Sequence, residues 1–237
     1  MRIAIMQPYF FPYAGYFSLI KHTDKFILLD DVQYIRHGWI ERNRILNHNQ
    51  GWIYIKVPLV KEDGRITIIK KLKINNDQEW KQKIISQLIT YKKKAPYYKQ
   101  VTGLINEVFN KDFDEIVSLN KFSLESVCVY LGLEHDIEVF SKMNLSIEKP
   151  EAPDEWALNI CKAIGDVKEY WNPTGGQSFF DKNKYENAGI VLKFHKINLL
   201  PYDQFKAGFE PGLSIIDLMM FNPPQVINQM LDNYELE

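Results

Sequence analysis

The residues best suited to chemistry lie in an aromatic loop near the N-terminus, where Gln7 precedes Tyr9, Tyr13 and Tyr16. Phenol groups donate hydrogen bonds and present flat apolar faces, and a glutamine amide can orient a polar ligand. The loop follows the apolar run 3–6, which is typical of a buried strand, and leads into an apolar helix start. Ligands of open α/β sheets bind where a strand gives way to a helix, and the N-terminus of that helix suits an anion such as phosphate. We therefore predict that these four residues bind substrate.

A second polar group follows the apolar run 25–29, where Asp30 and Asp31 end a predicted strand and Gln33 comes two residues later. A carboxylate in this position could act as a general base. Successive side chains on a strand point to opposite faces, so only one aspartate should face a ligand while the other caps a turn or a helix. We predict that Asp31 is catalytic and that Gln33 binds substrate.

Trp39, Arg42, Asn43 and Arg44 form the third group. Two guanidinium groups beside an aromatic ring suit a phosphate or a carboxylate, and the Asn43 amide can orient the ligand. An alternative interpretation is structural, with an ion pair between one of these arginines and the aspartates at 30–31. The two interpretations do not exclude each other, and we predict that all four residues bind substrate.

The C-terminal half contributes Thr174, Gly175 and Gly176, and then His195. Successive backbone N–H groups in a glycine-rich turn can bind an anion, although a single Gly-Gly pair is also common in plain turns. His195 ends a predicted strand, where a general base would be well placed. A lone histidine is also often a structural hydrogen-bonding residue. We predict that His195 is catalytic and that the three residues at 174–176 bind substrate.

Strands and helices alternate along the chain, which predicts an α/β fold. Strands at 2–6 and 25–30 flank a helix at 14–23, which is the pattern of a right-handed βαβ unit in a mostly parallel sheet. Nucleotidyltransferase-like and HUP-like folds begin in this way. A helical middle and a mixed C-terminal part follow. We predict a single α/β domain over 1–237, in which the helices at about 77–132 are a candidate subdomain.

The remaining elements are predicted from periodicity and turn residues. A hairpin is expected to join strands 52–57 and 65–69 through a turn at 61–64. Ser214 is predicted to cap a helix that has Asp217 at its third position. The polar segment 141–152 is interpreted as a linker or lid. Further helices are expected at 77–91, up to 110, at 112–131, after 153, after 214 and at 224–232, and further strands at 135–140, 169–171 and 190–194.

Composition narrows the class of protein. The 237 residues are 46% hydrophobic and 25% charged with a net charge of −1, which is typical of a soluble globular protein and argues against a nucleic-acid partner. The chain has no apolar run of about 18 residues and no signal peptide, so we expect a cytoplasmic protein without membrane insertion. Cys128 and Cys161 have no Cys or His at zinc spacing, which predicts reduced thiols and no metal site. The sequence identifies no cofactor, and its aromatic content of 14% is compatible with a homodimer.

The stretch Tyr13-Ala14-Gly15-Tyr16 resembles the His-x-Gly-His signature of nucleotidyltransferases and pantothenate-synthetase-like ligases, with both histidines replaced by tyrosine. In those families the two histidines contact the phosphates of a nucleotide. Tyrosine can donate a hydrogen bond to a phosphate or stack on a base, but it carries no positive charge near neutral pH. The resemblance therefore favours a nucleotide-binding architecture without adenylyl-transfer chemistry.

Five motifs together resemble the WbqC-like family, and they occur in the family's order over nearly the whole chain. They are Met6–Tyr16, Asp30–Tyr34, Trp39–Arg44, Pro173–Gly176 and Leu213–Leu218. Members are bacterial and are commonly encoded with enzymes that make O-antigen and other surface polysaccharides. Two departures are visible: Glu41 stands where asparagine is frequent, and Asn222 is followed by Pro-Pro where glycine is frequent.

The resemblance implies an enzyme of bacterial surface-polysaccharide (O-antigen, lipopolysaccharide) biosynthesis. We expect a transferase that moves an acyl or aminoacyl group to a nucleotide-linked amino sugar, with a nucleotide-sugar or another small phosphorylated molecule as its substrate. One alternative is an ATP-dependent nucleotidyltransferase or ligase. Another is a non-catalytic binding or assembly protein of the polysaccharide machinery.

Overall fold

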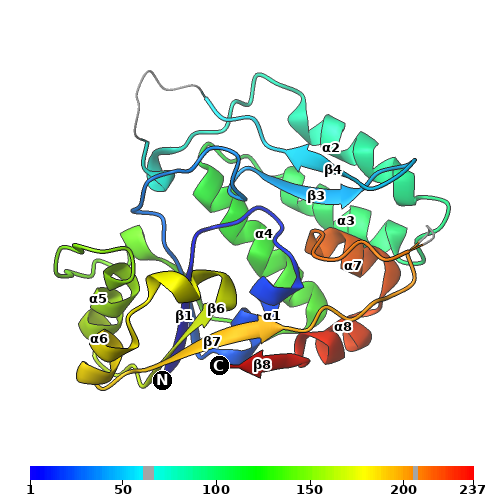
Figure 1. The fold of residues 1–237 in the computed structure, drawn as a ribbon. Coiled ribbons are helices and arrows are strands. Elements are labelled where there is room, and N and C mark those ends of the chain that lie inside the picture. The colour runs from blue at the N-terminus through cyan, green and yellow to red at the C-terminus, as the bar shows by residue number, and fades with distance from the viewer. Residues whose placement is uncertain (61–66, 205–207) are drawn as a thin grey trace.

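The computed structural model describes residues 1–60, 67–204 and 208–237, and a six-stranded sheet lies at its centre (Figure 1). The strand order is β5-β2-β1-β6-β7-β8, and in this sheet β8 alone runs antiparallel to its neighbour. The strands are β1 (Arg2–Met6), β2 (Lys25–Leu28), β5 (Ile137–Val139), β6 (Glu169–Pro173), β7 (Val191–Ile197) and β8 (Tyr234–Leu236). The predicted α/β fold with a mostly parallel sheet is confirmed.

The first three elements form the predicted βαβ unit. Helix α1 (Ala14–His22) connects β1 to β2, and the two strands pair in parallel register from Ile3–Lys25 to Met6–Leu28. A parallel sheet carries its crossover helices on its faces, so its central strands are apolar on both sides. The continuous apolar runs in β1 and β2 are the sequence consequence of that burial.

Helices cover both faces of the sheet (Figure 1). Ala4 and Phe26 belong to the larger apolar core, which they share with α1, α4 and α8. Ile3, Ile5 and Ile27 point to the opposite face and pack with α5 and α6. These four further helices are α4 (Ile116–Leu131), α5 (Glu155–Ile164), α6 (Lys182–Asn187) and α8 (Pro224–Leu231).

The helical middle extends the larger core. Helices α2 (Trp80–Leu88) and α3 (Tyr98–Phe109) precede α4, and α3 packs against both α4 and α7 (Ile215–Phe221). Helix α4 ends at Gly132, whose φ of +67° lies in the left-handed region that glycine adopts without steric cost. The helices predicted in this part of the chain are confirmed, and the candidate subdomain stays a prediction.

The hairpin prediction is wrong in its partner strand. β4 (Trp52–Lys56) pairs antiparallel with β3 (Arg42–Leu46), and the connecting turn has Gly51 at φ +65°. Residues 61–66, which include the predicted turn, lie outside the described residues. The described part of the predicted second strand, 65–69, is not a strand. Ile68 forms an isolated bridge with Gln33, and Ile69–Lys71 form a 3₁₀ turn. The sequence did not predict β3 as a strand, because its first residues, Arg42, Asn43 and Arg44, are polar and resemble a ligand-binding loop.

Several short elements lack a sequence signal. These are α6, β8, and 3₁₀ turns at Phe140–Lys142 and Thr174–Phe179, whereas the predicted helix at 77–91 ends in a 3₁₀ turn at Ile89–Tyr91. Ser214 caps α7 as predicted, because its Oγ accepts a hydrogen bond of 3.3 Å from the N–H of Ile216. Asp217 does not complete a capping box. Its buried carboxylate instead accepts hydrogen bonds from the hydroxyls of Tyr91 and Tyr202, both at 2.6 Å.

None of the helices in the described parts of the chain has the length and apolar character needed to cross a membrane.

Candidate functional site

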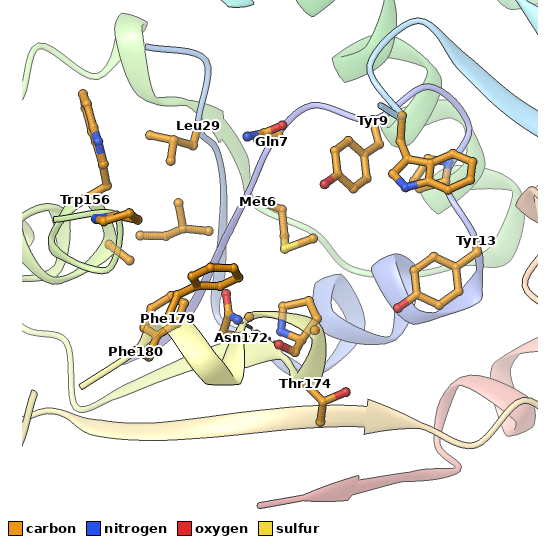
Figure 2. Close-up of a pocket in the computed structure, with 18 of the residues that line it drawn as sticks. Met6, Gln7, Tyr9, Tyr13, Leu29, Trp156, Asn172, Thr174, Phe179 and Phe180 are labelled. Atoms are coloured by element: carbon orange, nitrogen blue, oxygen red, sulfur yellow. Dashed lines mark hydrogen bonds between the residues drawn. The ribbon is translucent and has the colours of Figure 1, made fainter. Parts of the chain in front are cut away.

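A cavity of about 700 Å³ opens at the carboxyl ends of β1 and β6 (Figure 2). Strand ends of a parallel sheet are the usual place for a ligand site, and this volume is ordinary for a small-molecule pocket. The described residues that line it are Ile5, Met6, Gln7, Tyr9, Pro12, Tyr13, Leu29, Trp39, Asn43, Arg44, Pro153, Trp156, Ala157, Tyr170, Asn172, Pro173, Thr174, Gly175, Gly176, Phe179, Phe180 and Gly212.

Buried amide and hydroxyl groups from distant segments hold the aromatic loop in place. The Nδ2 of Asn43 donates hydrogen bonds to the carbonyls of Phe10 at 3.0 Å and Phe11 at 2.9 Å. Ser214 donates to the same Phe11 carbonyl at 2.7 Å. Phe11 has a φ of +39°, a left-handed conformation that costs a non-glycine residue about 1–2 kcal/mol. The three hydrogen bonds offset that cost and fix the path of the loop.

Tyr13 and Gly15 build the wall at the start of α1. A Cβ atom added to Gly15 would lie 2.5 Å from the Tyr13 ring, so glycine is what lets the phenol lie against the first helical turn. Burial raises the pKa of Tyr13, and burial together with the neighbouring Tyr13 raises the pKa of Tyr9. Both hydroxyls therefore remain protonated at neutral pH and can donate hydrogen bonds to an anionic ligand.

Tyr16 does not line the cavity. It is fully buried, and its hydroxyl donates a hydrogen bond of 2.8 Å to the carbonyl of Gln7. Burial raises its pKa well above the ordinary value, so the hydroxyl stays a donor. Tyr16 positions the residue that follows β1 and supports the cavity from behind.

Arg44 is the one charged side chain among the described residues that line the cavity. Its guanidinium lies 5.4 Å from the ring centroid of Trp39 and 5.2 Å from that of Trp52, and Nη2 donates a hydrogen bond of 3.0 Å to the Gly212 carbonyl. Its Nε is buried without a hydrogen-bond partner, and no described carboxylate pairs with the guanidinium. The buried Nε is out of reach of a ligand, but Arg44 lines the cavity with a cation that has no carboxylate partner, and such a group suits a bound anion.

The opposite wall starts from Asn172, at the end of β6. The Tyr170 hydroxyl donates to its Oδ1 at 2.9 Å, and its Nδ2 donates to the Pro173 carbonyl at 2.8 Å. A Cβ atom on Gly176 would collide with that Nδ2. Glycine is therefore required at 176 for the 3₁₀ turn Thr174–Phe179 to fold against the strand.

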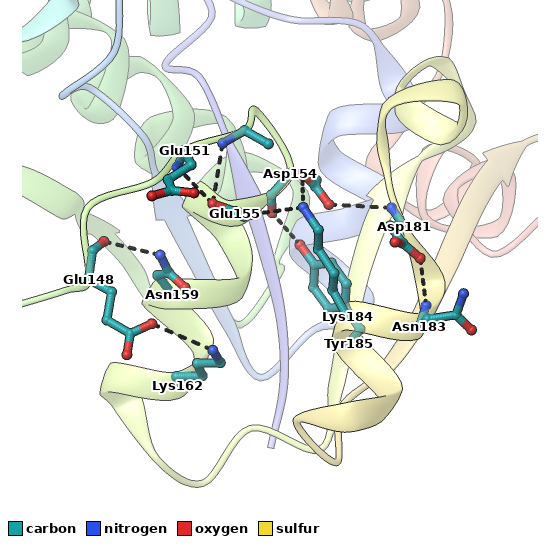
Figure 3. A network of polar contacts seen from close by, with 11 residues as sticks. Glu148, Glu151, Asp154, Glu155, Asn159, Lys162, Asp181, Asn183, Lys184 and Tyr185 are labelled. Carbon is teal, nitrogen blue, oxygen red and sulfur yellow. Dashed lines mark hydrogen bonds and ion pairs between the residues drawn. The ribbon is translucent and has the colours of Figure 1, made fainter.

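The third wall is the start of α5, which carries Trp156. A polar network ties this helix start to α6 (Figure 3). Lys184 lies 3.2 Å from the buried carboxylate of Asp154 and 2.8 Å from that of Glu155. The Tyr185 hydroxyl donates to the Asp154 carbonyl at 2.8 Å. The hydrogen bond from Lys184 is the main cause that lowers the pKa of Glu155 to about 2.

The walls differ in chemistry. Figure 2 shows Tyr9 and Tyr13 on one side of the cavity and Trp156 with Leu29 on the other, with Phe179 and Phe180 beside them. Arg44 belongs to the tyrosine side, since it contacts Trp39. The cavity thus has a polar, cationic side and an apolar, aromatic side.

Nine of the predicted site residues line this cavity. They are Gln7, Tyr9, Tyr13, Trp39, Asn43, Arg44, Thr174, Gly175 and Gly176. Three predicted binding residues lie outside it: Tyr16, which is described above, and Arg42 and Gln33. Arg42 stacks over Tyr54, with 4.1 Å between its guanidinium carbon and the ring centroid, and donates hydrogen bonds to the carbonyls of His37 and Gly38. Gln33 forms the isolated bridge with Ile68.

The two predicted catalytic residues also lie outside the cavity. His195 is only 3% exposed, its Nε2 lies 2.9 Å from the Ser18 hydroxyl, and its ring stacks on Trp171. Burial lowers the pKa of His195 to about 4, so the ring is neutral at pH 7. Asp31 forms an ion pair of 2.8 Å with Lys70 and lines a second, smaller cavity.

Asp30 has the structural role that the strand alternation allows for one aspartate of the pair. Its Oδ1 accepts a hydrogen bond of 3.0 Å from the N–H of Ser141, and its Oδ2 accepts one of 2.6 Å from the Ser141 hydroxyl. Neither Arg42 nor Arg44 forms an ion pair with Asp30 or Asp31 in the described structure. The aspartates are paired with other partners, which leaves Arg44 available to a ligand.

Sequence reasoning missed the apolar side of the cavity. Trp156 fits the periodicity of a buried helix, and Asn172, Phe179 and Phe180 lie beside a short strand and an unpredicted turn. Phe179 carried a signal, because a phenylalanine that lies three residues after Gly175-Gly176 and outside every predicted helix or strand has no predicted core to pack into. In the structure its side chain is 65% exposed at the edge of the cavity.

Within the described parts of the chain, no group of three or more His, Cys, Asp or Glu side chains is arranged to hold a metal ion.

Comparison with known proteins agrees with the motifs. Residues 7–229 match the WbqC-like protein family. A relative from Mycobacterium tuberculosis (strain ATCC 25618 / H37Rv), the uncharacterized protein Rv1507c, is 28% identical over 220 residues, which is 92% of each chain. No solved structure matches this chain. The family match covers both the aromatic loop and the glycine-rich turn that face the cavity, and the chain belongs to the WbqC-like protein family.

Proposed function

We propose that this protein binds a nucleotide-linked sugar in the cavity at the ends of β1 and β6 and acts in the synthesis of bacterial surface polysaccharide. The observation that carries the proposal is Arg44, whose partly buried guanidinium belongs to the wall of a cavity without described carboxylates and has no ion-pair partner in the described structure. Such a group is stabilised by an anion, and arginine suits the geometry of phosphate. The polysaccharide context rests on the family resemblance.

The two sides of the cavity support an orientation for the ligand. The diphosphate would lie beside Arg44, where the neutral hydroxyls of Tyr9 and Tyr13 can donate further hydrogen bonds. The base would lie against Trp156 and Phe179, because aromatic side chains offer flat apolar faces for a ring.

The finer proposal is that the protein transfers an acyl or aminoacyl group from an activated donor such as a thioester to an amine of the bound sugar. The amine nitrogen would bond to the acyl carbon, the bond from that carbon to the donor sulfur would break, and the thiolate would leave with the amine proton. The proposal does not use His195, because that side chain is buried behind Ser18.

A second candidate, a non-catalytic binding or assembly protein, is favoured by one specific observation. The described residues that line the cavity include no aspartate, glutamate, histidine, lysine or cysteine. Most enzymes that move protons place one of these side chains at the reacting group. A protein that only holds a nucleotide sugar for another enzyme needs none of them.

Calorimetric titration with UDP-, GDP- and dTDP-linked sugars tests the binding proposal, with ATP, acetyl-CoA and the free sugars as comparison ligands. Wild-type protein should bind one class of nucleotide sugar, and Arg44→Met should weaken that binding at least tenfold. Arg42→Met is the matched control, because Arg42 is two residues earlier on the same strand and outside the cavity.

The outcomes separate the candidates. Equal affinity in wild type and Arg44→Met would contradict the phosphate role. Binding of ATP alone would favour a ligase. If a nucleotide sugar binds, product analysis after incubation with acetyl-CoA and aminoacyl donors distinguishes the transferase from the binding protein.

A further inference from the structure

A second cavity, of about 330 Å³, adjoins the first and supplies the charges that the first lacks. Trp156 lines both cavities, so its indole is a shared wall. The segment that follows β2 contributes to both cavities, because Leu29 lines the first cavity and Asp31 lines the second. Two small molecules bound in these cavities would therefore lie on either side of one side chain.

The charges of the second cavity come in both signs. Asp31 and Lys70 form an ion pair of 2.8 Å, with side chains that are 31% and 35% exposed. A carboxylate can accept about four hydrogen bonds and an ammonium can donate three, so each partner keeps capacity for a ligand. Lys149 adds a cation that forms no ion pair in the described structure.

We propose that this second cavity binds a free amino acid, or an amino-acid-like group, as a second ligand beside the nucleotide sugar. Its ammonium would bind Asp31, and its carboxylate would bind Lys70 and Lys149. A second carboxylate, Glu148, also lines the cavity and lies 3.7 Å from Lys162. Two cations and two anions around one small cavity match a zwitterion, whereas a second phosphate would have to lie close to both carboxylates.

The remaining walls define the side chain of that ligand. Phe140, Leu145 and Ile147 lie with Trp156 around the cavity and form its apolar part, and Ser141 and Asn144 add uncharged polar groups. A pocket in which a few placed charges meet apolar walls selects by side-chain shape once the charged ends are bound. We therefore expect an amino acid with an apolar side chain. This inference rests on the proposed function for the nucleotide sugar in the first cavity, but the amino-acid binding itself is measured independently.

Saturation-transfer NMR and calorimetric titration with the twenty free amino acids test the inference. An apolar amino acid should bind, and its N-acetyl and methyl-ester derivatives should each bind at least tenfold more weakly, because each loses one charge. Asp31→Asn and Lys70→Met should each weaken binding of the free amino acid at least tenfold. Asp136→Asn is the matched control: Asp136 pairs with Lys25 at 2.6 Å at the start of β2, the opposite end from Asp31.

Circular dichroism and the melting temperature show whether each variant is folded. Binding that survives both Asp31→Asn and Lys70→Met, or equal binding of the N-acetyl derivative, would overturn the inference. So would an absence of amino-acid binding in a protein that still binds a nucleotide sugar, and this outcome would leave the proposed function standing. Arg44→Met should lose the nucleotide sugar and keep the amino acid, which would support two separate sites.

Discussion

The Tyr13 ring lies against Gly15 at the first turn of α1, so closely that a methyl group at position 15 would stand 2.5 Å from the phenol. This contact turns the Tyr13 hydroxyl into part of the cavity wall. It also explains the glycine in the Tyr-Ala-Gly-Tyr motif, because the absence of a side chain at position 15 leaves room for the Tyr13 ring.

Gly15→Ala is predicted to weaken ligand binding more than it weakens the fold. The added methyl group would push the Tyr13 ring out of its position, and a ring at the end of a side chain can move without unfolding the helix. We expect at least a tenfold loss in nucleotide-sugar affinity by calorimetry. Gly103→Ala is the control, because a Cβ there meets nothing within 4 Å and α3 should gain about 1 kcal/mol in stability. Unchanged affinity in Gly15→Ala would show that the Tyr13 position does not matter for binding.

Asn120→Ala is predicted to destabilise the fold by roughly 2–3 kcal/mol, because it leaves two buried carbonyls without their donor. The Nδ2 of Asn120 donates to the carbonyls of Pro8 at 2.7 Å and Ile40 at 2.8 Å, and so ties α4 to the aromatic loop. Urea unfolding measures the change in free energy. Asn106→Ala, on the exposed face of α3, should change it by less than about 0.5 kcal/mol. A loss of the same small size in Asn120→Ala would refute the anchoring role.

Lys184→Met is predicted to make stability less dependent on acid pH. The pKa of Glu155 is lowered from its ordinary value of 4.5 to about 2, with the Lys184 hydrogen bond as the main cause. Ionised Glu155 therefore stabilises the wild-type fold above pH 4.5, and this contribution is lost as the pH falls toward 2. In the variant the folded pKa moves back toward the unfolded one, so this loss becomes smaller.

Urea unfolding at neutral pH and at several acid pH values, together with an NMR titration of Glu155, measures this effect. Lys83→Met, which removes an exposed lysine from α2, controls for the change in net charge. An unchanged Glu155 titration in Lys184→Met would show that the lysine does not set its pKa.

Phe179→Ala is predicted to lower affinity for ring-bearing ligands while leaving the melting temperature unchanged. The side chain is 65% exposed, so its removal costs the core little, yet it lines the cavity. Affinity for the nucleotide sugar should fall several-fold, whereas inorganic pyrophosphate should bind as before. Val129→Ala, at 72% exposure on α4, is the control. An equal loss for both ligands would place Phe179 near the phosphates instead of the base.

Much of the fold follows from local sequence. The apolar runs of β1 and β2 with α1 between them predict a βαβ unit, because parallel strands are buried on both faces and need a crossover helix. The site could be placed at the end of β1 for the same reason. The pairing of β3 with β4 could not be predicted, because the strand pattern of Arg42–Leu46 is masked by its polar residues.

The roles of single residues depended on distant partners. Asp30 and Asp31 are neighbours, and strand alternation indicates only that their roles differ. Contacts with Ser141 and Lys70, far along the chain or across a loop, decide which role each has. His195 is predicted at a strand end, but it lies inside β7, paired with Pro173 and Leu236, and Ser18 of helix α1 contacts its ring.

Sequence alone predicted the N-terminal βαβ unit, the aromatic loop between β1 and α1, and the family to which the chain belongs, because these depend on local apolar runs and motifs. The tertiary structure decided which cation faces the cavity. Arg42 and Arg44 lie two residues apart on β3, so alternation places both on one face and cannot separate them. The Tyr54 ring and nearby carbonyls hold Arg42, whereas Arg44 reaches the carbonyl of Gly212. The alternation of a strand determines to which face a side chain points. The residues that it contacts on that face come from distant segments, which only folding brings together.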